Sequence, residues 1–337
     1  VNCCIFCYTL NMSKNTIKTS QQKIKIIESL FGNGIVSNDG TNISVSCPVC
    51  KKDAKTDGKK KKLAVVIESG VYHCWVCESK GRNISYIAKR HANVSKELLN
   101  KVYEIFLFKE TKKEIEEEEV RVLLPSDFEL LSFSKGRYAA SAKKYLRERG
   151  LSLDDLFKFK IGISSNGEFN NRVIFPSHCD NMNLNFYLSR TFDETTFRKY
   201  KNCEAKRKDI IYNEYLIDWS QPVILTEGIF DAIKAGENAV PMLGSWIDED
   251  YLLFRKLVVN NSDIILCLDP DAKDKEIKIA EKLSEYGNNV YLLPHQENDL
   301  GSMSYLDAKK LINKAKLFEQ SDRMAYLIQS IRSGSIF

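Results

Sequence analysis

The clearest candidates for chemistry in this 337-residue chain are acidic residues that follow two apolar segments. Glu227 lies near the end of the segment 223–228, and Asp269 and Asp271 end the segment 263–271. In a parallel sheet covered on both faces, strands are nearly continuous apolar runs and chemistry collects at their carboxyl ends. We therefore expect the three carboxylates to meet at one sheet edge. Like charges so close together need a counter-ion, and Mg²⁺ with its preference for oxygen ligands can supply it.

A second chemical feature is a set of four cysteines in the amino-terminal third. Cys47 and Cys50 form one CxxC pair, and after a gap of 23 residues Cys74 and Cys77 form another. Two such pairs present four thiolates to one ion, which predicts a structural Zn²⁺ site with tetrahedral geometry. Because thiols stay reduced in the cytoplasm, where we expect this protein, metal binding is favoured over disulfides. His73 could replace a ligand, but four cysteines already complete the shell.

Basic and aromatic residues surround the two cysteine pairs. A run of lysines at 51–62 lies between them, and Trp75, Lys80 and Arg82 lie in or after the second pair. A lysine run is often only a solvated loop. Beside a zinc site, however, lysines that neutralise phosphate and an aromatic ring that stacks on a base favour single-stranded nucleic acid as the partner.

The elements that must position these residues follow from the apolar pattern. Around the acidic residues we expect helices at 229–235, 248–257 and 273–286 and strands at 223–228, 238–243, 263–268 and 290–293. This alternation predicts parallel strands joined by right-handed crossovers. Around the cysteines we expect strands at 43–47, 63–68 and 71–74, followed by a helix at 83–90. The simpler interpretation of 269–271 as a plain turn remains open, because Asp and Pro are common in turns.

Composition sets limits on the class of protein. The net charge is +5 and 43% of the residues are hydrophobic, so nucleic-acid contacts should come from local patches and the cores should be of ordinary size. No run of 18 apolar residues exists, so we expect no membrane span. Residues 1–11 are apolar but make a poor signal peptide. We expect the start at Met12 and exclude residues 1–11 from the fold.

The sequence from 221 to 300 resembles the TOPRIM domain shared by DnaG-type primases, topoisomerases and some nucleases and recombination proteins. The resemblance lies in residues 227–232, in 243–245 and in 269–271. It implies that Glu227, Asp269 and Asp271 are catalytic and that these three together with Asp231 hold Mg²⁺, with Mn²⁺ as an alternative. Pro270 and Asp274 stand where the family often has glycine. Asp299 loosely matches a later acidic position.

The preceding segment, 122–220, resembles the amino-terminal half of the polymerase domain of DnaG-type primases. The resemblance lies in a helix at 142–150 that ends in Arg-Gly, the segment 159–162, strands at 172–176 and 184–190, and a loop at 199–202. It implies that four basic residues face the template or the incoming nucleotide: Arg172, Arg190, Lys199 and Lys208. Taken singly, each could also be ordinary surface charge.

The predicted fold class is therefore multi-domain α/β. We expect a zinc-ribbon module at 12–108, a charged linker at 109–121, a mixed α+β polymerase half-domain at 122–220, a TOPRIM domain at 221–300 and a helical segment at 301–337. This order is most similar to the stand-alone primases of T-even-type bacteriophages. It implies synthesis of short RNA primers from ribonucleoside triphosphates on single-stranded DNA, in the host cytoplasm for a phage protein.

Two partners and three alternatives accompany this interpretation. The chain has no P-loop motif, so a separate hexameric helicase would unwind DNA, and a single-stranded-DNA-binding protein is a further expected partner. A recombination mediator also combines four cysteines with TOPRIM, but about 145 residues separate Cys77 from Val223. A TOPRIM nuclease would normally lack the zinc ribbon, and a topoisomerase would need a much larger chain.

Overall fold

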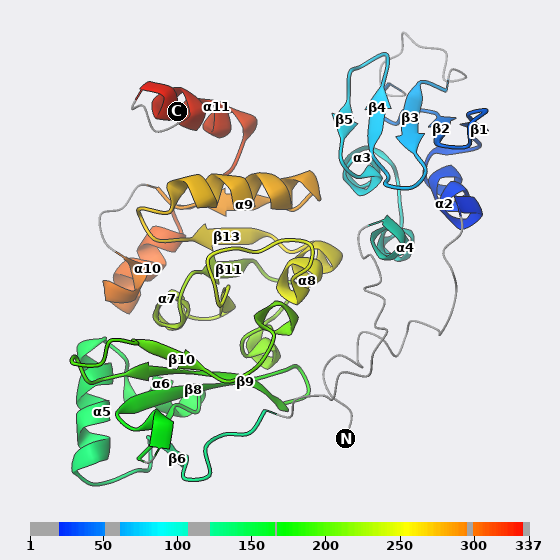
Figure 1. The fold of residues 1–337 in the computed structure, drawn as a ribbon. Coiled ribbons are helices and arrows are strands. Elements are labelled where there is room, and N and C mark those ends of the chain that lie inside the picture. The colour runs from blue at the N-terminus through cyan, green and yellow to red at the C-terminus, as the bar shows by residue number, and fades with distance from the viewer. Residues whose placement is uncertain (1–19, 51–60, 107–121, 166, 295–298, 333–337) are drawn as a thin grey trace.

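The computed structural model describes residues 20–50, 61–106, 122–165, 167–294 and 299–332. Three five-stranded sheets organise these residues (Figure 1). The predicted extension at 1–11, the linker at 109–121 and most of the lysine run lie outside the described residues. Within the described part of the chain, no helix has the length and apolar character needed to cross a membrane.

The first sheet belongs to the module that carries the four cysteines. Its strands, all antiparallel to their neighbours, are β1 (Ile35–Val36), β2 (Asn42–Val45), β3 (Leu63–Val66), β4 (Tyr72–Cys74) and β5 (Lys80–Gly81). Its helices are α2 (Ser20–Phe31), α3 (Ile84–His91) and α4 (Lys96–Phe106). Alternate residues of β2 and β3 are buried, as expected for a sheet with one face on a core. Asn83 begins α3, because its side chain accepts a hydrogen bond from the Ser85 N–H. The strands and the helix predicted for this module are confirmed.

The second sheet is antiparallel and has the order β10-β9-β8-β7-β6. Its elements are β6 (Glu129–Leu130), α5 (Arg137–Glu148), α6 (Leu153–Lys158), β7 (Gly162–Ser164), η2 (Gly167–Phe169), β8 (Arg172–His178), β9 (Leu184–Thr191), β10 (Tyr200–Asn202), η3 (Arg207–Asp209) and η4 (Glu214–Leu216). Within the segment 159–162, only Gly162 belongs to a strand, the start of β7. The preceding residues end α6, where Lys160 adopts a left-handed conformation and closes the helix.

The third sheet has the order β12-β11-β13-β14-β15. Its elements are β11 (Val223–Thr226), α7 (Ile229–Ala235), β12 (Ala239–Pro241), α8 (Leu252–Asn260), β13 (Ile264–Cys267), α9 (Lys273–Glu285), β14 (Val290–Leu292), η5 (Leu300–Ser302), α10 (Tyr305–Ile312), β15 (Lys316–Leu317) and α11 (Gln320–Arg332). The four predicted strands are parallel, which confirms the expected alternation. The antiparallel strand β15 was not predicted, because its two exposed residues give no apolar pattern.

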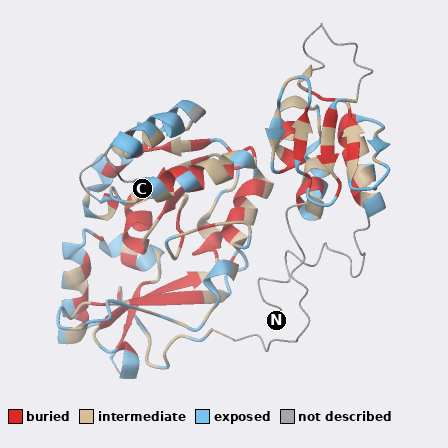
Figure 2. Cartoon of the chain, turned by 45° about the horizontal axis from the view of Figure 1, so that its top comes forward, coloured by how far each residue is buried: buried red, intermediate tan, exposed pale blue. Residues whose placement is uncertain are grey.

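The second and third sheets share one apolar core (Figure 2). Phe175 of β8 meets Phe230 of α7 edge to face, with ring centres 5.5 Å apart, and both side chains are buried. The helix α4 connects the cysteine module to this body. Its residue Val102 lies in the core of the cysteine module, whereas the next residue, Tyr103, is buried in the shared core. The Lys89 ammonium of the module also donates to the Gly287 carbonyl after α9.

We predict that Phe175→Ala lowers the unfolding free energy by about 3–5 kcal/mol, because it empties a fully buried site between two sheets. The loss should affect both sheets in one cooperative transition. Urea unfolding followed by circular dichroism measures it. Phe197→Ala is the matched control, since the Phe197 side chain is fully exposed and its removal should leave stability nearly unchanged. A small effect of Phe175→Ala would contradict the shared core.

Candidate metal centres and nucleic-acid interface

The parallel pairing of β11 and β13 sets the position of the first candidate site. Thr226 of β11 lies opposite Cys267 of β13, so the residues that follow both strands leave the sheet at the same edge. The Asp269 backbone N–H approaches Glu227 Oε1 at 3.4 Å. The predicted meeting of Glu227 with the Asp269 loop at this edge therefore agrees with the strand register.

Three carboxylates gather at this edge within the described residues. Asp231 from the first turn of α7, Asp269 after β13 and Asp299 before η5 place oxygens within 4.8 Å of one another. Burial, a bond to Asp299 and the charges of Asp299 and Asp269 raise the pKa of Asp231 to about 8. Burial and the neighbouring carboxylates, Glu227 first among them, also raise the pKa of Asp269. We call these three residues the acidic triad. Their carboxylates repel one another and offer only oxygen ligands, so a divalent cation bound between them would be stabilising.

Two glycines hold the Asp231 carboxylate in place. The Gly228 N–H donates to Asp231 Oδ2 at 3.2 Å, and the Gly301 N–H donates to Asp231 Oδ1 at 2.8 Å. A Cβ at Gly228 would lie 2.9 Å from Asp231 Oδ2, and one at Gly301 would lie 2.8 Å from Oδ1. Any other residue at either position would push the carboxylate away. The Gly301 N–H also binds Asp299 at 2.7 Å, so one amide connects two members of the triad.

Glu227 and Asp271 lie next to the acidic triad rather than within it. Glu227 Oε2 forms an ion pair of 2.7 Å with Lys275 of α9, and both side chains are about four-fifths buried. Asp271 is exposed and contributes to the raised pKa of Asp269 through its charge. Metal binding by Glu227 and Asp271 therefore stays a prediction. Asp299 was left out of the predicted ligands, and its signal in the sequence is an Asp-x-Gly pattern soon after a parallel strand.

Asp274, which stands where the family often has glycine, contacts residues of α9 and α11. Its carboxylate accepts from Lys278 at 2.6 Å and from the Tyr326 hydroxyl of α11 at 3.1 Å. The bond to Lys278 is the main reason why the pKa of Asp274 lies below its usual value. Asp274 therefore attaches the carboxyl-terminal helix to the start of α9.

The four predicted cysteines come together in the first module. Their sulfurs lie within 4.8 Å of one another, with Cys47 and Cys77 at 3.8 Å and Cys50 and Cys74 at 3.7 Å. A tetrahedral ion with metal–sulfur bonds of about 2.3 Å requires sulfur separations of about 3.8 Å, whereas a disulfide requires about 2.05 Å. Burial raises the pKa of the Cys47 thiol to about 11, so ion binding must displace protons. The geometry fits one metal ion.

The other predicted residues of this module lie on its surface. Trp75 is 69% exposed, and Lys80 and Arg82 are exposed as well. His73 points away from the sulfurs, because its Nε2 pairs with Glu78 at 3.0 Å and its ring packs edge-on against Trp75 at 4.3 Å. His73 is therefore not a fifth metal ligand. Arg82 lies 3.8 Å from Glu285 of α9, so it also touches the third-sheet part of the molecule.

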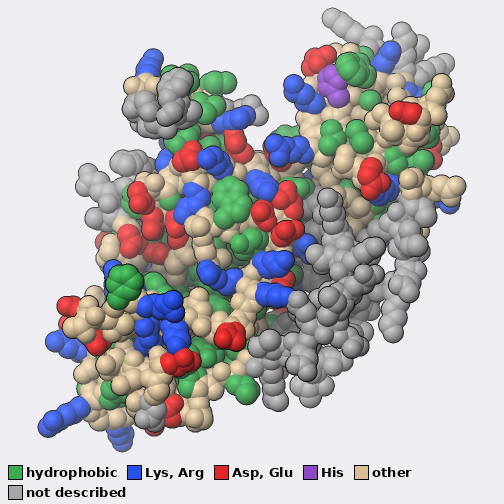
Figure 3. Space-filling model, viewed as in Figure 1, with side chains coloured by type: hydrophobic (Ala, Val, Ile, Leu, Met, Phe, Trp, Pro, Cys, Tyr) green, Lys and Arg blue, Asp and Glu red, His purple; other side chains and the backbone are tan. Residues whose placement is uncertain are grey.

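Basic residues of the second sheet approach the acidic triad. The Arg190 guanidinium lies 5.2 Å from the centre of the Phe230 ring, and that of Arg149 lies 5.4 Å from the same ring. Phe230 immediately precedes Asp231 in α7, so the two cations lie against the residue next to one member of the triad. Arg149 was not predicted, and only its place at the end of the Arg-Gly helix signals it. Lys199 and Lys208 are exposed, and Lys and Arg side chains gather over the region of β10 (Figure 3).

Arg172 differs from the expectation. Its side chain is 94% buried, and its guanidinium donates to the carbonyls of Arg198 at 2.7 Å and Lys199 at 3.2 Å. Burial also lowers the pKa of Arg172. Its position therefore does not agree with a direct contact to template or nucleotide. Arg172 supports the loop that presents Lys199.

Comparison with known proteins agrees with this arrangement. No protein-family model matches the chain. The curated DNA primase of Listeria innocua is 23% identical, with 73% of this chain and 48% of that protein covered. The DNA primase of Helicobacter pylori is 22% identical, with 77% and 53% covered. The chain is similar to DnaG-type DNA primases. It spans about half the length of the curated relatives it matches.

Solved primase structures also match the fold at low similarity. The zinc-binding and RNA polymerase domains of Aquifex aeolicus primase give a TM-score of 0.46 at 15% identity, with 93% of this chain and 88% of that chain covered. The RNA polymerase domain of Mycobacterium tuberculosis primase DnaG gives 0.45 at 16% identity, with 54% and 78% covered.

For the cysteine cluster we predict that Cys50→Ser lowers bound zinc below one ion per chain. The module should then melt at a lower temperature than in the wild type, because binding free energy at a structural site is also folding free energy. Elemental analysis and thermal unfolding measure both effects. Cys203→Ser, outside the cluster, should retain the zinc. Full zinc occupancy in Cys50→Ser would contradict the assignment.

For the acidic edge we predict that Lys275→Met destabilises the protein by about 1–3 kcal/mol in metal-free buffer, because Glu227 loses its charged partner. Added Mg²⁺ should restore more stability in this variant than in the wild type. Urea unfolding with and without MgCl₂ measures the difference. Lys278→Met is the matched control, since Lys278 pairs with Asp274 at an exposed position of the same helix. Equal stability of Lys275→Met and the wild type would contradict the role of Lys275.

Proposed function

We propose that this chain is a DNA primase that synthesises short RNA primers on single-stranded DNA. The observation that carries the proposal is the acidic triad at the carboxyl ends of parallel strands, with Arg149 and Arg190 beside it. An oxygen-only cluster next to cations suits a triphosphate substrate, whose negative charge needs both a metal and guanidinium groups. The sequence similarity to DNA primases supports this choice over a nuclease or a recombination mediator.

In this proposal Asp231, Asp269 and Asp299 hold Mg²⁺ or Mn²⁺, and Glu227 and Asp271 complete the site. A divalent ion bound there would neutralise charge on the triphosphate and make the 3′-hydroxyl more acidic; this hydroxyl attacks the α-phosphorus, and pyrophosphate leaves. Arg149 and Arg190 bind phosphate oxygens and orient the nucleotide for attack. Their guanidinium groups lie against the Phe230 ring, which limits their motion.

The remaining parts have separate roles in the proposal. The module at 12–108 holds one structural Zn²⁺ and binds the template strand through Trp75, Lys80 and Arg82. The segment at 122–220 is the polymerase half-domain, with Lys199 and Lys208 on the nucleic acid. The TOPRIM domain covers 221–300 and the carboxyl-terminal segment 301–337. A hexameric helicase and a single-stranded-DNA-binding protein are the proposed partners, and the stand-alone phage primases are the proposed subtype.

The test is incubation of the full chain with single-stranded DNA, four ribonucleotides and MgCl₂. We expect short RNA products from the wild type. Asp269→Ala should lower product formation at least about a hundredfold, since it removes a group that fixes charge at the reacting centre. Asp274→Ala is the control, because this nearby acid binds α11 instead. Gel electrophoresis of labelled products gives the readout.

Other outcomes of the same assay would overturn the proposal. Full RNA synthesis by Asp269→Ala would show that the active site does not include Asp269. Cleavage of the DNA without RNA synthesis would indicate a nuclease, and the absence of both products would indicate a mediator.

A further inference from the structure

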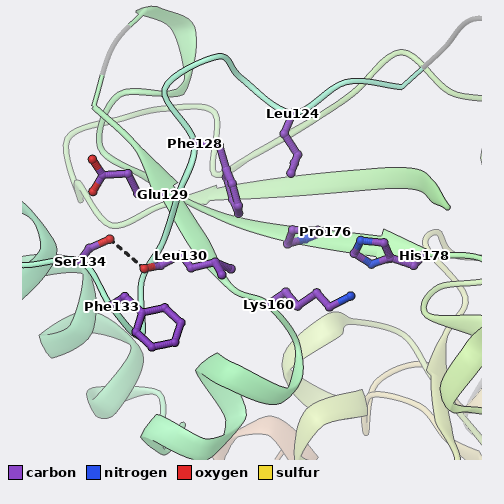
Figure 4. A pocket seen from close by; sticks show the side chains of 9 residues that line it. All are labelled: Leu124, Phe128, Glu129, Leu130, Phe133, Ser134, Lys160, Pro176 and His178. Atoms are coloured by element: carbon purple, nitrogen blue, oxygen red, sulfur yellow. Dashed lines mark hydrogen bonds between the residues drawn. The ribbon is translucent and has the colours of Figure 1, made fainter. Parts of the chain in front are cut away.

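A pocket of about 590 Å³ lies on the second sheet, apart from the acidic triad (Figure 4). It is lined by Leu124, Phe128, Glu129, Leu130, Phe133, Ser134, Lys160, Pro176 and His178. Phe175 of β8 packs against α7, so the neighbouring Pro176 faces the opposite side of the strand. The pocket therefore opens away from the face that supports the proposed reaction. Its volume is in the range of ligand-binding pockets.

Two polar side chains, Lys160 and His178, line one end of the pocket. The Lys160 ammonium and the His178 ring both lie against the Tyr215 ring, at 5.5 Å and 6.0 Å from its centre. His178 Nδ1 is buried without a hydrogen-bond partner, and the Lys160 side chain forms no ion pair with any residue that the structure describes. Burial and the charge of Lys160 lower the pKa of His178. This end of the pocket offers one cation, the Lys160 ammonium.

The backbone at Lys160 gives an independent reason to assign a role to this side chain. Lys160 has a φ of 51° and lies just past the end of α6, where its N–H donates to the Phe157 carbonyl and the Ile161 N–H donates to the Leu156 carbonyl. Glycine is the favoured residue at such a position, because a Cβ there is strained. A strained side chain that points into a pocket indicates that the side chain itself has a use.

The other end of the pocket is apolar and continues onto the surface. Phe133 is 68% exposed and meets Phe157 of α6 edge to face at 6.1 Å, and Phe157 is 64% exposed. Leu130 lies at the same rim. Figure 4 shows Glu129 at this end, pointing away from Lys160. A connected group of exposed aromatic and aliphatic side chains marks a surface that another molecule covers.

We propose that this pocket binds an acidic peptide segment of a partner protein. A carboxylate of the segment pairs with Lys160, and an adjacent large apolar side chain fills the space between Phe128, Leu130 and Phe133. A free small acid would leave the Phe133–Phe157 pair uncovered, whereas a peptide can continue over it. A nucleic acid strand fits less well, because the pocket supplies one unpaired cation and carries Glu129 at its rim.

The test is a selection of phage-displayed seven-residue random peptides on the full chain, followed by fluorescence anisotropy with the best synthetic peptide. We expect selected sequences to combine Asp or Glu with a neighbouring Leu, Phe or Trp. Lys160→Gly should weaken binding at least about tenfold, the effect of losing one charge-assisted hydrogen bond. The melting temperature of this variant should not fall, because glycine relieves the left-handed strain.

Three further variants complete the design. Lys160→Arg retains the cation and should retain binding. Phe133→Ser should weaken binding, whereas Phe197→Ser, at a fully exposed phenylalanine on another loop, should not. The proposal would be overturned by selection of no acidic and apolar class, or by equal affinity of the selected peptide for Lys160→Gly. Displacement of the peptide by oligo(dT) that depends on Lys160 would assign the pocket to nucleic acid instead.

Discussion

The arrangement of the second and third sheets depends on one electrostatic constraint, the placement of a buried carboxylate beside two others. Asp231 is 91% buried, and its charge is held in place by backbone amides of two glycines from separate segments. Such a group is costly to bury unless its oxygens are bonded and a cation is near. The sheet edge, the first turn of α7 and the turn at η5 must therefore stay in fixed relation. The apolar core shared by the second and third sheets supplies that rigidity.

The shared core also explains why the basic side chains can act at this edge. Phe175 and Phe230 join the second sheet to α7, and Phe230 directly precedes Asp231. The same ring carries the guanidinium groups of Arg149 and Arg190 on its surface. One aromatic residue thus links the packing of two sheets to the spacing between acid and base. Lys275 of α9 adds a further cation at this edge, where it forms an ion pair with Glu227.

Much of this arrangement could be predicted from the sequence because its signals are local. The CxxC pairs and the acids after apolar strands depend on spacing alone. The structure brings the four cysteines together as expected, whereas at the sheet edge Asp269 gathers with Asp231 and Asp299, and Glu227 and Asp271 lie next to them. Asp299 joins the triad through a turn whose position depends on α7, which lies about 70 residues earlier in the chain. The Arg172 side chain is buried because it donates to two backbone carbonyls of a later loop, and no sequence pattern specifies that contact. Such contacts arise from tertiary packing, so a single sequence does not reveal them.

The helix α4 gives the two parts of the molecule a connection beyond the covalent chain. Val102 and Tyr103 are neighbours in sequence, yet each is fully buried in a different core. Because consecutive helical residues point in directions about 100° apart, one short helix can serve both cores at once. A break in the chain between 106 and 122 would therefore leave the cysteine module in contact with the second and third sheets. The two pieces would be held together by noncovalent contacts, those of α4 together with those of Lys89 and Arg82.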